Sequence, residues 1–473
     1  DSQLVGGLAG APVPLSFPAS YRFTIGDIWF EGALSLKGRN AELNINRMKW
    51  FSRDPDFELQ QLAGTISVEP SLTSVKDLVI QSRNSYVELD ASISRSLLEG
   101  MPPLPGLRDD SVSLRLTSRN VDYGELSRFL TYIPRGRGAA AIRCDADGPF
   151  GNLRVSRLNV VTSRSSVEVR GTVSRLHTPE NLHLDAWIEP SRVTLSDLDL
   201  FIREIPEDVL SPDLPIGVKG HFVGLPLDFT TDLELDGDFG RVSGRNNLHL
   251  NTTPPAYSGS YEMDGFNPGL LFGKEFPRTL LNGRMELQGE DFDPERMKTN
   301  FFLILDSSRF RGYDFDALQA NGSMSSGTID AEVHGSSGRT EADASFSARL
   351  AGDTLSVHNA DFSVASLDLS MLLQDSLYRS DITARGRVSF TASSVDDLNA
   401  RAALALLPSR FRGHAMEADS ISFVLDQDDP RRTLLRLTSS MAEVELDGAF
   451  DLDLLAEMAE SRFAGLVRAV GGY

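Results

Sequence analysis

The chain has little of what chemistry or a membrane span requires. Cysteine occurs once, as Cys144, so neither an internal disulfide framework nor a cysteine-based zinc site can be built. Cys144 stands in an alternating run, which predicts a buried strand residue and not a nucleophile. No apolar run, including 301–305, approaches the roughly 18 residues that a membrane-spanning helix needs.

Basic residues are also in deficit. The chain has 46 Lys and Arg against 67 Asp and Glu, a formal net charge of −21, and no basic run. Nucleic acid is therefore excluded as a partner, and so is attachment to anionic lipid headgroups by bulk charge. The chain lacks an initiator Met and a leader at Asp1, which predicts an internal fragment whose anchor or export signal lies elsewhere.

Catalytic signatures are missing as well. There is no Gly-x-Ser-x-Gly elbow, no phosphate loop and no dinucleotide fingerprint, and the seven histidines are scattered. The segments 236–240 and 291–295 contain closely spaced carboxylates, but their Asp, Gly and Pro content favours turns over a calcium loop or a carboxylate pair. The sequence predicts no catalytic residue, no metal site, no cofactor and a protein that is not an enzyme.

The sequence does contain apolar residues that alternate with polar ones, a period of two. In 182–189, Leu184, Ala186 and Ile188 point one way, while the intervening polar residues point the other. Val112 and Leu114 alternate with polar residues in the same manner. This pattern is typical of strands with one buried and one wet face.

Two kinds of segment recur. Residues 81–93, 162–173, 335–346 and 438–450 each start with a small polar turn and pass into an alternating strand, as a hairpin does. The segments of the second kind are short, apolar and often closed by proline, which predicts one or two helical turns. They begin at Val121, Val193, Phe266 and Leu367. Their starts are 72, 73 and 101 residues apart, and the run 308–312 recurs as 409–413, also at an offset of 101.

This regularity predicts modules that stack on one another, each too small to be stable alone. We expect one continuous β-repeat groove over 1–473. The approximate modules are 1–120, 121–192, 193–265, 266–366 and 367–450. Residues 451–473 are expected to form a terminal amphipathic helix that closes the sheet.

The style of the repeats resembles the AsmA-like family, in particular the TamB-type translocation and assembly proteins. The features that carry the resemblance are Ser-x-Val-x-Val/Leu-x-Gly strands, Leu-Ser-Asp-Leu segments, and the run 306–318 followed by Gly322. They cover essentially the whole chain. The amino-terminal anchor and carboxy-terminal domain typical of the family are not found here.

The resemblance implies an all-β fold: an elongated antiparallel sheet of repeats, curled into a taco-shaped groove with short helical segments. It implies a location in the periplasm of a Gram-negative bacterium, between the inner and outer membranes. The implied ligands are phospholipid acyl chains, and the implied activity is passive lipid transfer or support of outer-membrane assembly. An Omp85-type outer-membrane barrel would be a partner, and the inner membrane would be reached through an anchor outside this chain.

The residues expected to line the groove for lipid are the inward members of the alternating strands. They are Val112, Leu114, Leu116, Val167, Val169, Leu184, Ala186, Ile188, Val444 and Leu446. The same residues could form a core beneath a cap. The alternative from another class is a surface adhesin or passive structural β-solenoid with a filled interior, and a glycan-active β-solenoid enzyme is more remote because no converging carboxylates are seen.

Overall fold

The fold is that of a computed structural model, which describes residues 24–449 except 55, 99, 128–137, 199–213, 273–278, 294–295, 311–312, 352–353, 373–374, 393–397, 430–431 and 441. The chain divides into two compact units. Unit 1 comprises residues 1–253 and 268–276, and unit 2 comprises residues 254–267 and 277–473. The expected terminal helix at 451–473 lies outside the described residues.

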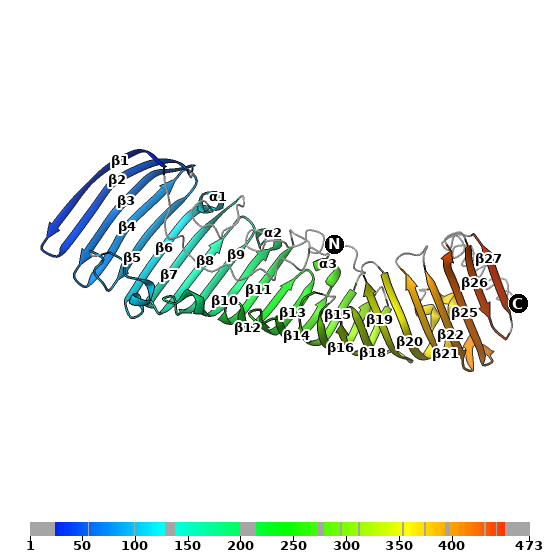
Figure 1. Cartoon of the computed structure of the whole chain (residues 1–473). Coiled ribbons are helices and arrows are strands. Elements are labelled where there is room, and N and C mark those ends of the chain that lie inside the picture. Colours follow the sequence, from blue (N-terminus) through cyan, green and yellow to red (C-terminus); the bar gives the residue numbers. More distant parts are fainter. Residues whose placement is uncertain are drawn as a thin grey trace. The chain divides into compact units, whose positions relative to one another are not determined.

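Unit 1 is an antiparallel sheet whose strands follow the chain order (Figure 1). Its strands are β1 Thr24–Lys37, β2 Asn40–Asp54, β3 Asp56–Glu69, β4 Leu72–Ser82, β5 Tyr86–Ile93, β6 Ser111–Asp122, β7 Ala139–Pro149, β8 Asn152–Val161, β9 Ser166–Ser174, β10 His183–Thr194, β11 Pro215–Leu225, β12 Asp228–Gly237 and β13 Gly240–His249. Its helices are η1 Leu104–Leu107, α1 Tyr123–Leu126, η2 Pro179–Asn181, α2 Leu195–Leu198 and α3 Pro268–Phe272.

Unit 2 has the same architecture. Its strands are β14 Ala256–Phe266, β15 Thr279–Glu290, β16 Lys298–Phe310, β17 Tyr313–Ser325, β18 Thr328–Ser337, β19 Thr340–Ala351, β20 Thr354–Leu367, β21 Ser380–Ala392, β22 Asn399–Leu406, β23 Ser409–Phe411, β24 His414–Met416, β25 Asp419–Asp429, β26 Arg432–Thr438 and β27 Glu443–Gly448. Its helices are α4 Leu369–Leu372 and η3 Ser376–Tyr378. The small hairpin β23–β24 pairs with β21, while β22 pairs with β25.

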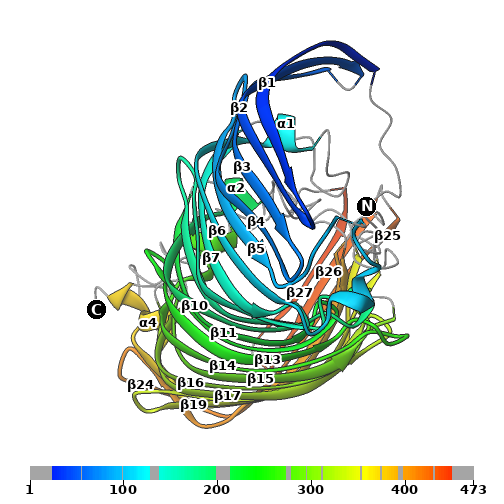
Figure 2. The same ribbon diagram turned by 90° about the vertical axis from the view of Figure 1, so that its left-hand side faces the viewer.

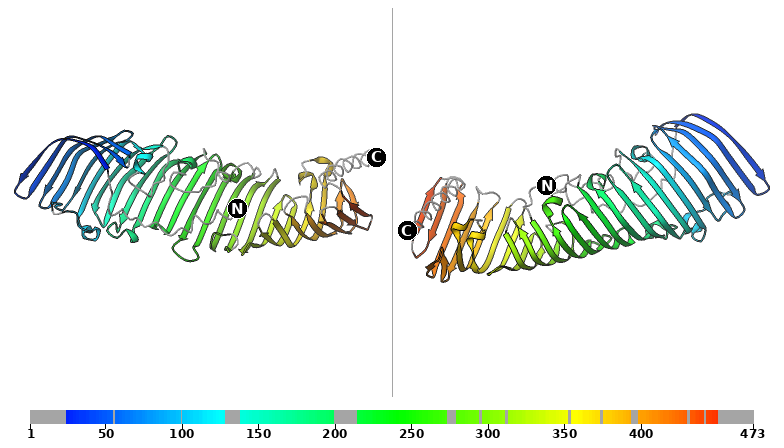
Figure 3. Two further views of the ribbon diagram at one scale, coloured as in Figure 1. Left: turned by 45° about the horizontal axis from the view of Figure 1, so that its top comes forward. Right: turned by 180° about the vertical axis from the view of Figure 1, so that it is seen from behind.

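The strands bend along their length, so that each unit is a curled and not a flat sheet, as Figure 2 shows for β10 and β11 in unit 1 and for β16, β17 and β19 in unit 2. Figure 3 shows from two further sides that consecutive strands lie next to each other within each unit. Among the described residues, β1 pairs only with β2 and β27 only with β26. The prediction of an all-β, antiparallel, curled and unclosed sheet with short helical segments is confirmed.

Both recurring segments take the predicted forms. All four polar segments turn into strands, namely β5, β9, β19 and β27, and the four apolar segments contain the single-turn helices α1 to α4. The segment 236–240 lies at a turn, since Gly237 opposes Gly240 in a hairpin, and in the described part of 291–295 the Asp291 carboxylate accepts the N–H groups of Phe292 and Asp293.

The 101-residue offset has a structural counterpart in unit 2. The Ser308 hydroxyl accepts the backbone N–H of Asn282 at 3.0 Å, and the Ser409 hydroxyl accepts that of Thr383 at 3.0 Å. Donor and acceptor are both displaced by 101 residues. The two serines are 2% and 6% exposed, so each satisfies a backbone group that would otherwise be unpaired where water is excluded.

In unit 1 the two recurring segments bind each other. The Glu125 carboxylate of α1 accepts hydrogen bonds from the Ser82 hydroxyl, the Ser85 hydroxyl at 2.7 Å and the Asn84 backbone N–H at 3.1 Å. Glu125 is only 7% exposed. A buried carboxylate is tolerated here because three donors replace its water. We call this cluster the turn–helix latch.

The latch is repeated 72 residues later. Asp197 of α2 accepts hydrogen bonds from the hydroxyls of Thr162 and Ser165, both at 2.5 Å. The two turns share one geometry, because the backbone N–H of Ser165 donates to the Thr162 hydroxyl at 2.8 Å and that of Ser85 donates to the Ser82 hydroxyl at 2.9 Å. In these two places an acidic residue of a one-turn helix fastens a hairpin turn to the end of the strand that follows the hairpin: the β4–β5 turn to β6, and the β8–β9 turn to β10.

Removing the latch carboxylate should destabilise unit 1. Glu125→Ala leaves two hydroxyls and one N–H without their acceptor in a buried place, which costs on the order of 2 kcal/mol. The measurement is urea unfolding followed by circular dichroism. Glu88→Ala is the matched control, since Glu88 is exposed and accepts one hydrogen bond from Tyr86, and it should change the unfolding free energy by less than about 0.5 kcal/mol. Equal effects of the two variants would contradict the role given to Glu125.

Candidate functional site

One face of unit 1 is apolar from strand to strand. Leu114 of β6 lies opposite Ala146 of β7, which lies opposite Val155 of β8. The same row continues through Gly171 of β9 to Ala186 of β10. Because pairing in register keeps opposed residues on one face, these side chains form a continuous apolar row that crosses the strands. We call this surface the apolar face of unit 1.

All eight expected lining residues of unit 1 lie on this face. Val112 and Leu116 flank Leu114, Val169 opposes Ile188, and Val173 opposes Leu184. Each of the eight is partly exposed, neither buried nor fully open to solvent. They are Val112, Leu114, Leu116, Val167, Val169, Leu184, Ala186 and Ile188.

The other two expected residues lie in unit 2, on its own apolar face. Val444 opposes Leu437 and Leu446 opposes Leu435, and both belong to the edge strand β27, where they are 43% and 37% exposed. One central row of this face consists of Tyr261, Met285, Leu303, Ala320, Val333, Ala344, Phe362, Gly386, Leu404 and Ile421.

Among the described residues, no second layer covers these faces. The helices α1 and α2 contact the strands from which they continue, β6 and β10, and α4 contacts η3 and β21. The hydrophobic side chains that are buried are few for two sheets of this size, and several are alanines, such as Ala146, Ala320 and Ala331. The described part of each sheet therefore leaves many apolar side chains partly exposed, covered only by their neighbours within the sheet.

Glycines on the apolar face were missed by sequence reasoning. A Cβ atom on Gly386 would lie 3.0 Å from Cζ of Phe362 on the neighbouring strand, and one on Gly322 would lie 2.7 Å from Cζ of Phe301. Each ring thus lies over the backbone of a glycine. Which glycine lies beneath which ring depends on the pairing of strands, so no local signal in the sequence identifies these pairs.

Gly283 is constrained by its backbone. Its φ angle is +145°, and a Cβ atom there would lie 2.0 Å from the carbonyl oxygen of Ile304. It sits beside a register shift in the pairing of β15 with β16. Only glycine accommodates both the angle and the close approach of the next strand.

Cys144 also lies on the apolar face of unit 1. It opposes Leu116 on one side and Leu158 on the other, and it is half-buried. Burial, assisted by the charge of Asp145, raises the pKa of the thiol. The thiolate is therefore disfavoured, which fits a packing residue.

The opposite face of each sheet carries the charges. In unit 1, Arg245 binds the Asp232 carboxylate at 2.8 and 3.1 Å across β12 and β13, and these hydrogen bonds hold the pKa of Asp232 below its usual value. In the same cross-strand row, Trp187 stacks on His221 with ring centroids 3.9 Å apart. Such exposed pairs fix register more than they add stability, because water screens them.

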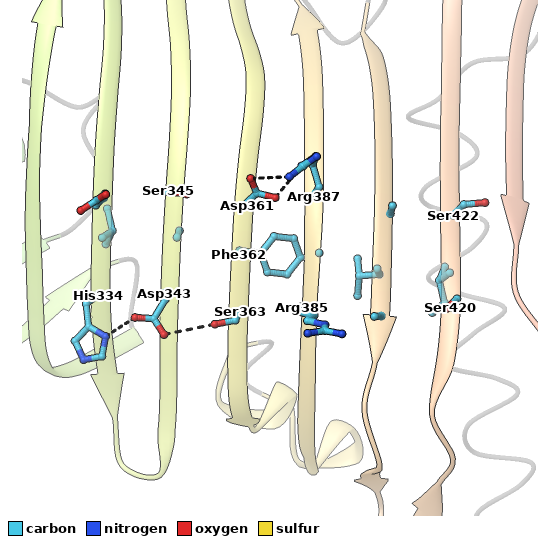
Figure 4. Close-up of a pocket in the computed structure, with 18 of the residues that line it drawn as sticks. His334, Asp343, Ser345, Asp361, Phe362, Ser363, Arg385, Arg387, Ser420 and Ser422 are labelled. Carbon is cyan, nitrogen blue, oxygen red and sulfur yellow. Dashed lines mark hydrogen bonds and ion pairs between the residues drawn. The ribbon is translucent and has the colours of Figure 1, made fainter.

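A hollow of about 1100 Å³ lies on the sheet of unit 2, lined by residues of the charged face and also by Val333, Phe362, Leu404 and Ile421 of the apolar row (Figure 4). Small side chains such as Ser345, Ser363 and Ser420 line the hollow beside longer charged ones. Two cross-strand contacts lie in it: His334 with Asp343 at 2.7 Å, and Arg387 with Asp361 at 2.7 and 3.1 Å (Figure 4). Its charges are thus largely matched within the sheet, as on a solvated face.

Within the part of the chain that the structure describes, no three or more His, Cys, Asp or Glu side chains are grouped so as to hold a metal ion. None of the described helices is both long and apolar enough to cross a bilayer.

Comparison with known proteins identifies no relative. No protein-family model matches the chain, and neither a curated protein nor a solved structure shows significant similarity to it. The resemblance to the AsmA-like family therefore stays a prediction from the style of the repeats.

The close approach at Gly283 can be tested by adding one methyl group. Gly283→Ala should destabilise unit 2 by more than about 1 kcal/mol, because alanine disfavours the φ angle and its Cβ meets the Ile304 carbonyl. The control is Gly335→Ala on β18, where the nearest atom to an added Cβ is 3.8 Å away. Guanidinium unfolding should show a lower midpoint for the first variant only, and matching midpoints would refute the assigned constraint.

Proposed function

We propose that this chain binds the acyl chains of phospholipids along its apolar faces and acts as a carrier segment, not as a catalyst. The observation that supports the proposal is the continuity of the apolar rows from strand to strand, with side chains that no described element covers. An apolar surface of this extent that remains accessible to water needs an occupant.

The bend of the strands adds a second argument. Bending crowds the side chains on the inner face of a sheet and spreads those on the outer face. On β10, Leu184 and Ile188 are half-buried, whereas Asp185 and Trp187 on the other face are exposed. We infer that the apolar face of unit 1 is the inner one, so that this unit would surround an acyl chain on more than one side.

The energetics suit a carrier. Each methylene group that leaves water against an apolar surface gains about 0.8 kcal/mol. Successive strands present similar residues, Leu114, Ala146, Val155 and Ala186 along one row. A ligand held by such a row gains little by stopping at any one strand, so movement along it meets low barriers.

The adhesin or filled solenoid is the second candidate. It requires interior side chains that are packed to completion, as in a protein core. The partly exposed state of Val112, Leu116 and Val169 favours an open face over that arrangement.

On the strength of the resemblance we further propose that the chain works in the periplasm of a Gram-negative bacterium, between the two membranes. An Omp85-type barrel would be its partner in the outer membrane, and an anchor outside this chain would connect it to the inner membrane. The chain's excess of acidic residues agrees with binding lipid by its tails and not by anionic headgroups.

Lipid binding is tested by mass spectrometry of phospholipid that copurifies with the chain after expression in a bacterial envelope. Val169→Lys places a charge on the apolar face of unit 1, where contact with hydrocarbon costs several kcal/mol, and should reduce bound phospholipid severalfold. Leu184→Asp should act in the same way.

The matched control is Val223→Lys. Val223 is half-buried like Val169, but it opposes Asp185 and therefore lies on the charged face. This variant should keep its lipid, and both variants should keep the circular dichroism of the parent chain. Absence of copurified lipid from the parent chain, or equal loss from both lysine variants, would exclude the proposal; unfolding of Val169→Lys alone would favour a closed core.

A further inference from the structure

The edge strand β1 is the most exposed apolar element that the structure describes. Its large side chains Ile28, Trp29, Phe30, Leu34 and Leu36 are between 48% and 68% exposed. On β2, one strand further in, the same face is far better covered. Ile45, which opposes Gly32, is 5% exposed, and Leu43, which opposes Leu34, is half-buried. Among the described residues β1 has a lateral neighbour on one side only, which accounts for this exposure.

The two edges of the described chain differ. β1 has 14 residues and carries aromatic side chains, whereas β27 has six residues, of which three are acidic. Short length and charge are the usual protection of an edge strand against pairing. β27 has both, and the exposed part of β1 from Ile28 to Leu36 has one charged residue, Glu31.

We infer that β1 pairs with β1 of a second copy of this chain, antiparallel and in the register centred on Gly32. The inference does not rest on lipid binding. A strand can pair with its own copy only if the opposed residues share a face, which requires that their two numbers add to an even sum. Ile28, Phe30, Leu34 and Leu36 all have even numbers and therefore share one face, so the possible registers are few and can be compared.

The register centred on Gly32 opposes every exposed apolar side chain of that face with another. Ile28 lies against Leu36 of the second copy, and Phe30 lies against Leu34 of the second copy. On the other face, Trp29 meets Ser35, and Glu31 meets Ala33. No like charges oppose each other in this arrangement.

The neighbouring registers are worse. Moving the centre to Glu31 sets two glutamates against each other, which is destabilising in a cross-strand pair. Moving it to Phe30 leaves Leu34 and Leu36 without an apolar partner, and moving it to Ala33 leaves Ile28 opposite the turn residue Gly38. Of these registers, only the one centred on Gly32 pairs the apolar side chains on one face without opposing like charges on the other. The strand is therefore complementary to the same strand of a second copy.

Such pairing has a geometric result. The two-fold axis stands perpendicular to the sheet at Gly32, so each copy keeps its apolar face on the same side as that of the other. Antiparallel addition also supplies partners for the outward backbone N–H and C=O groups of β1, which have none among the described residues.

The first test is the mass of the intact chain by sedimentation equilibrium over a range of concentrations. We expect a species of twice 51.8 kDa that dissociates on dilution. Phe30→Lys should abolish it, because the ammonium group would face Leu34 of the second copy. Leu446→Lys is the matched control at the other edge, where the replaced side chain is also exposed, and it should leave the mass of the dimer unchanged.

The second test reads the register directly. The double variant Phe30→Cys with Leu34→Cys should form a disulfide-linked dimer under mild oxidation, because positions 30 and 34 oppose each other across the axis. Ile28→Cys with Leu34→Cys should form little, since those positions oppose each other only in the register centred on Glu31. A monomer at all concentrations, a dimer indifferent to Phe30→Lys, or crosslinking by the 28/34 pair alone would overturn the inference.

Discussion

The structure depends on one constraint, the strict alternation of side chains along a strand combined with pairing in register. A residue fixes the face of its partner on the next strand, and that partner fixes the face of the following one. A single one-residue slip would exchange the apolar and charged faces from that strand onward. Irregularities such as the shift between Ile188 and Ser191 in the pairing of β10 with β11 therefore have to be compensated within the same strand.

The compensation uses buried hydroxyl groups. Ser191 lies at that shift, is 8% exposed, and its hydroxyl accepts the backbone N–H of Glu168 at 3.0 Å. Ser308 and Ser409 do the same in unit 2. A hydroxyl both donates and accepts, so it can bridge a break in the ladder without leaving a polar group unpaired. The bulges thus bend the sheet while the faces stay separated.

Much of the fold could be predicted from the sequence, because the faces of the strands and the positions of the hairpins depend on residues that are close together in the chain. Alternation placed Leu184 and Asp185 on opposite faces, polar turns marked the hairpins, and the 101-residue offset marked equivalent strands. Lateral register was not predictable, since it depends on residues far apart in the chain. The contact of Glu125 with Ser82 spans 43 positions, and nothing in either segment alone specifies the other. The glycines beneath Phe301 and Phe362 were hidden for the same reason, because a glycine in a strand reads as a weakness until its neighbour is known.

The turn–helix latch has a consequence for how unit 1 comes apart. Glu125 follows β6 but holds the turn between β4 and β5, so fraying of that hairpin requires the end of β6 to release as well. The smallest cooperative element is therefore a group of three strands and not a hairpin. Amide protons of β4, β5 and β6 near the latch would then exchange with solvent in a single concerted opening, while a second group fastened by Asp197 opens on its own. A long repetitive sheet built in this way loses structure in discrete blocks and does not unzip strand by strand from an end.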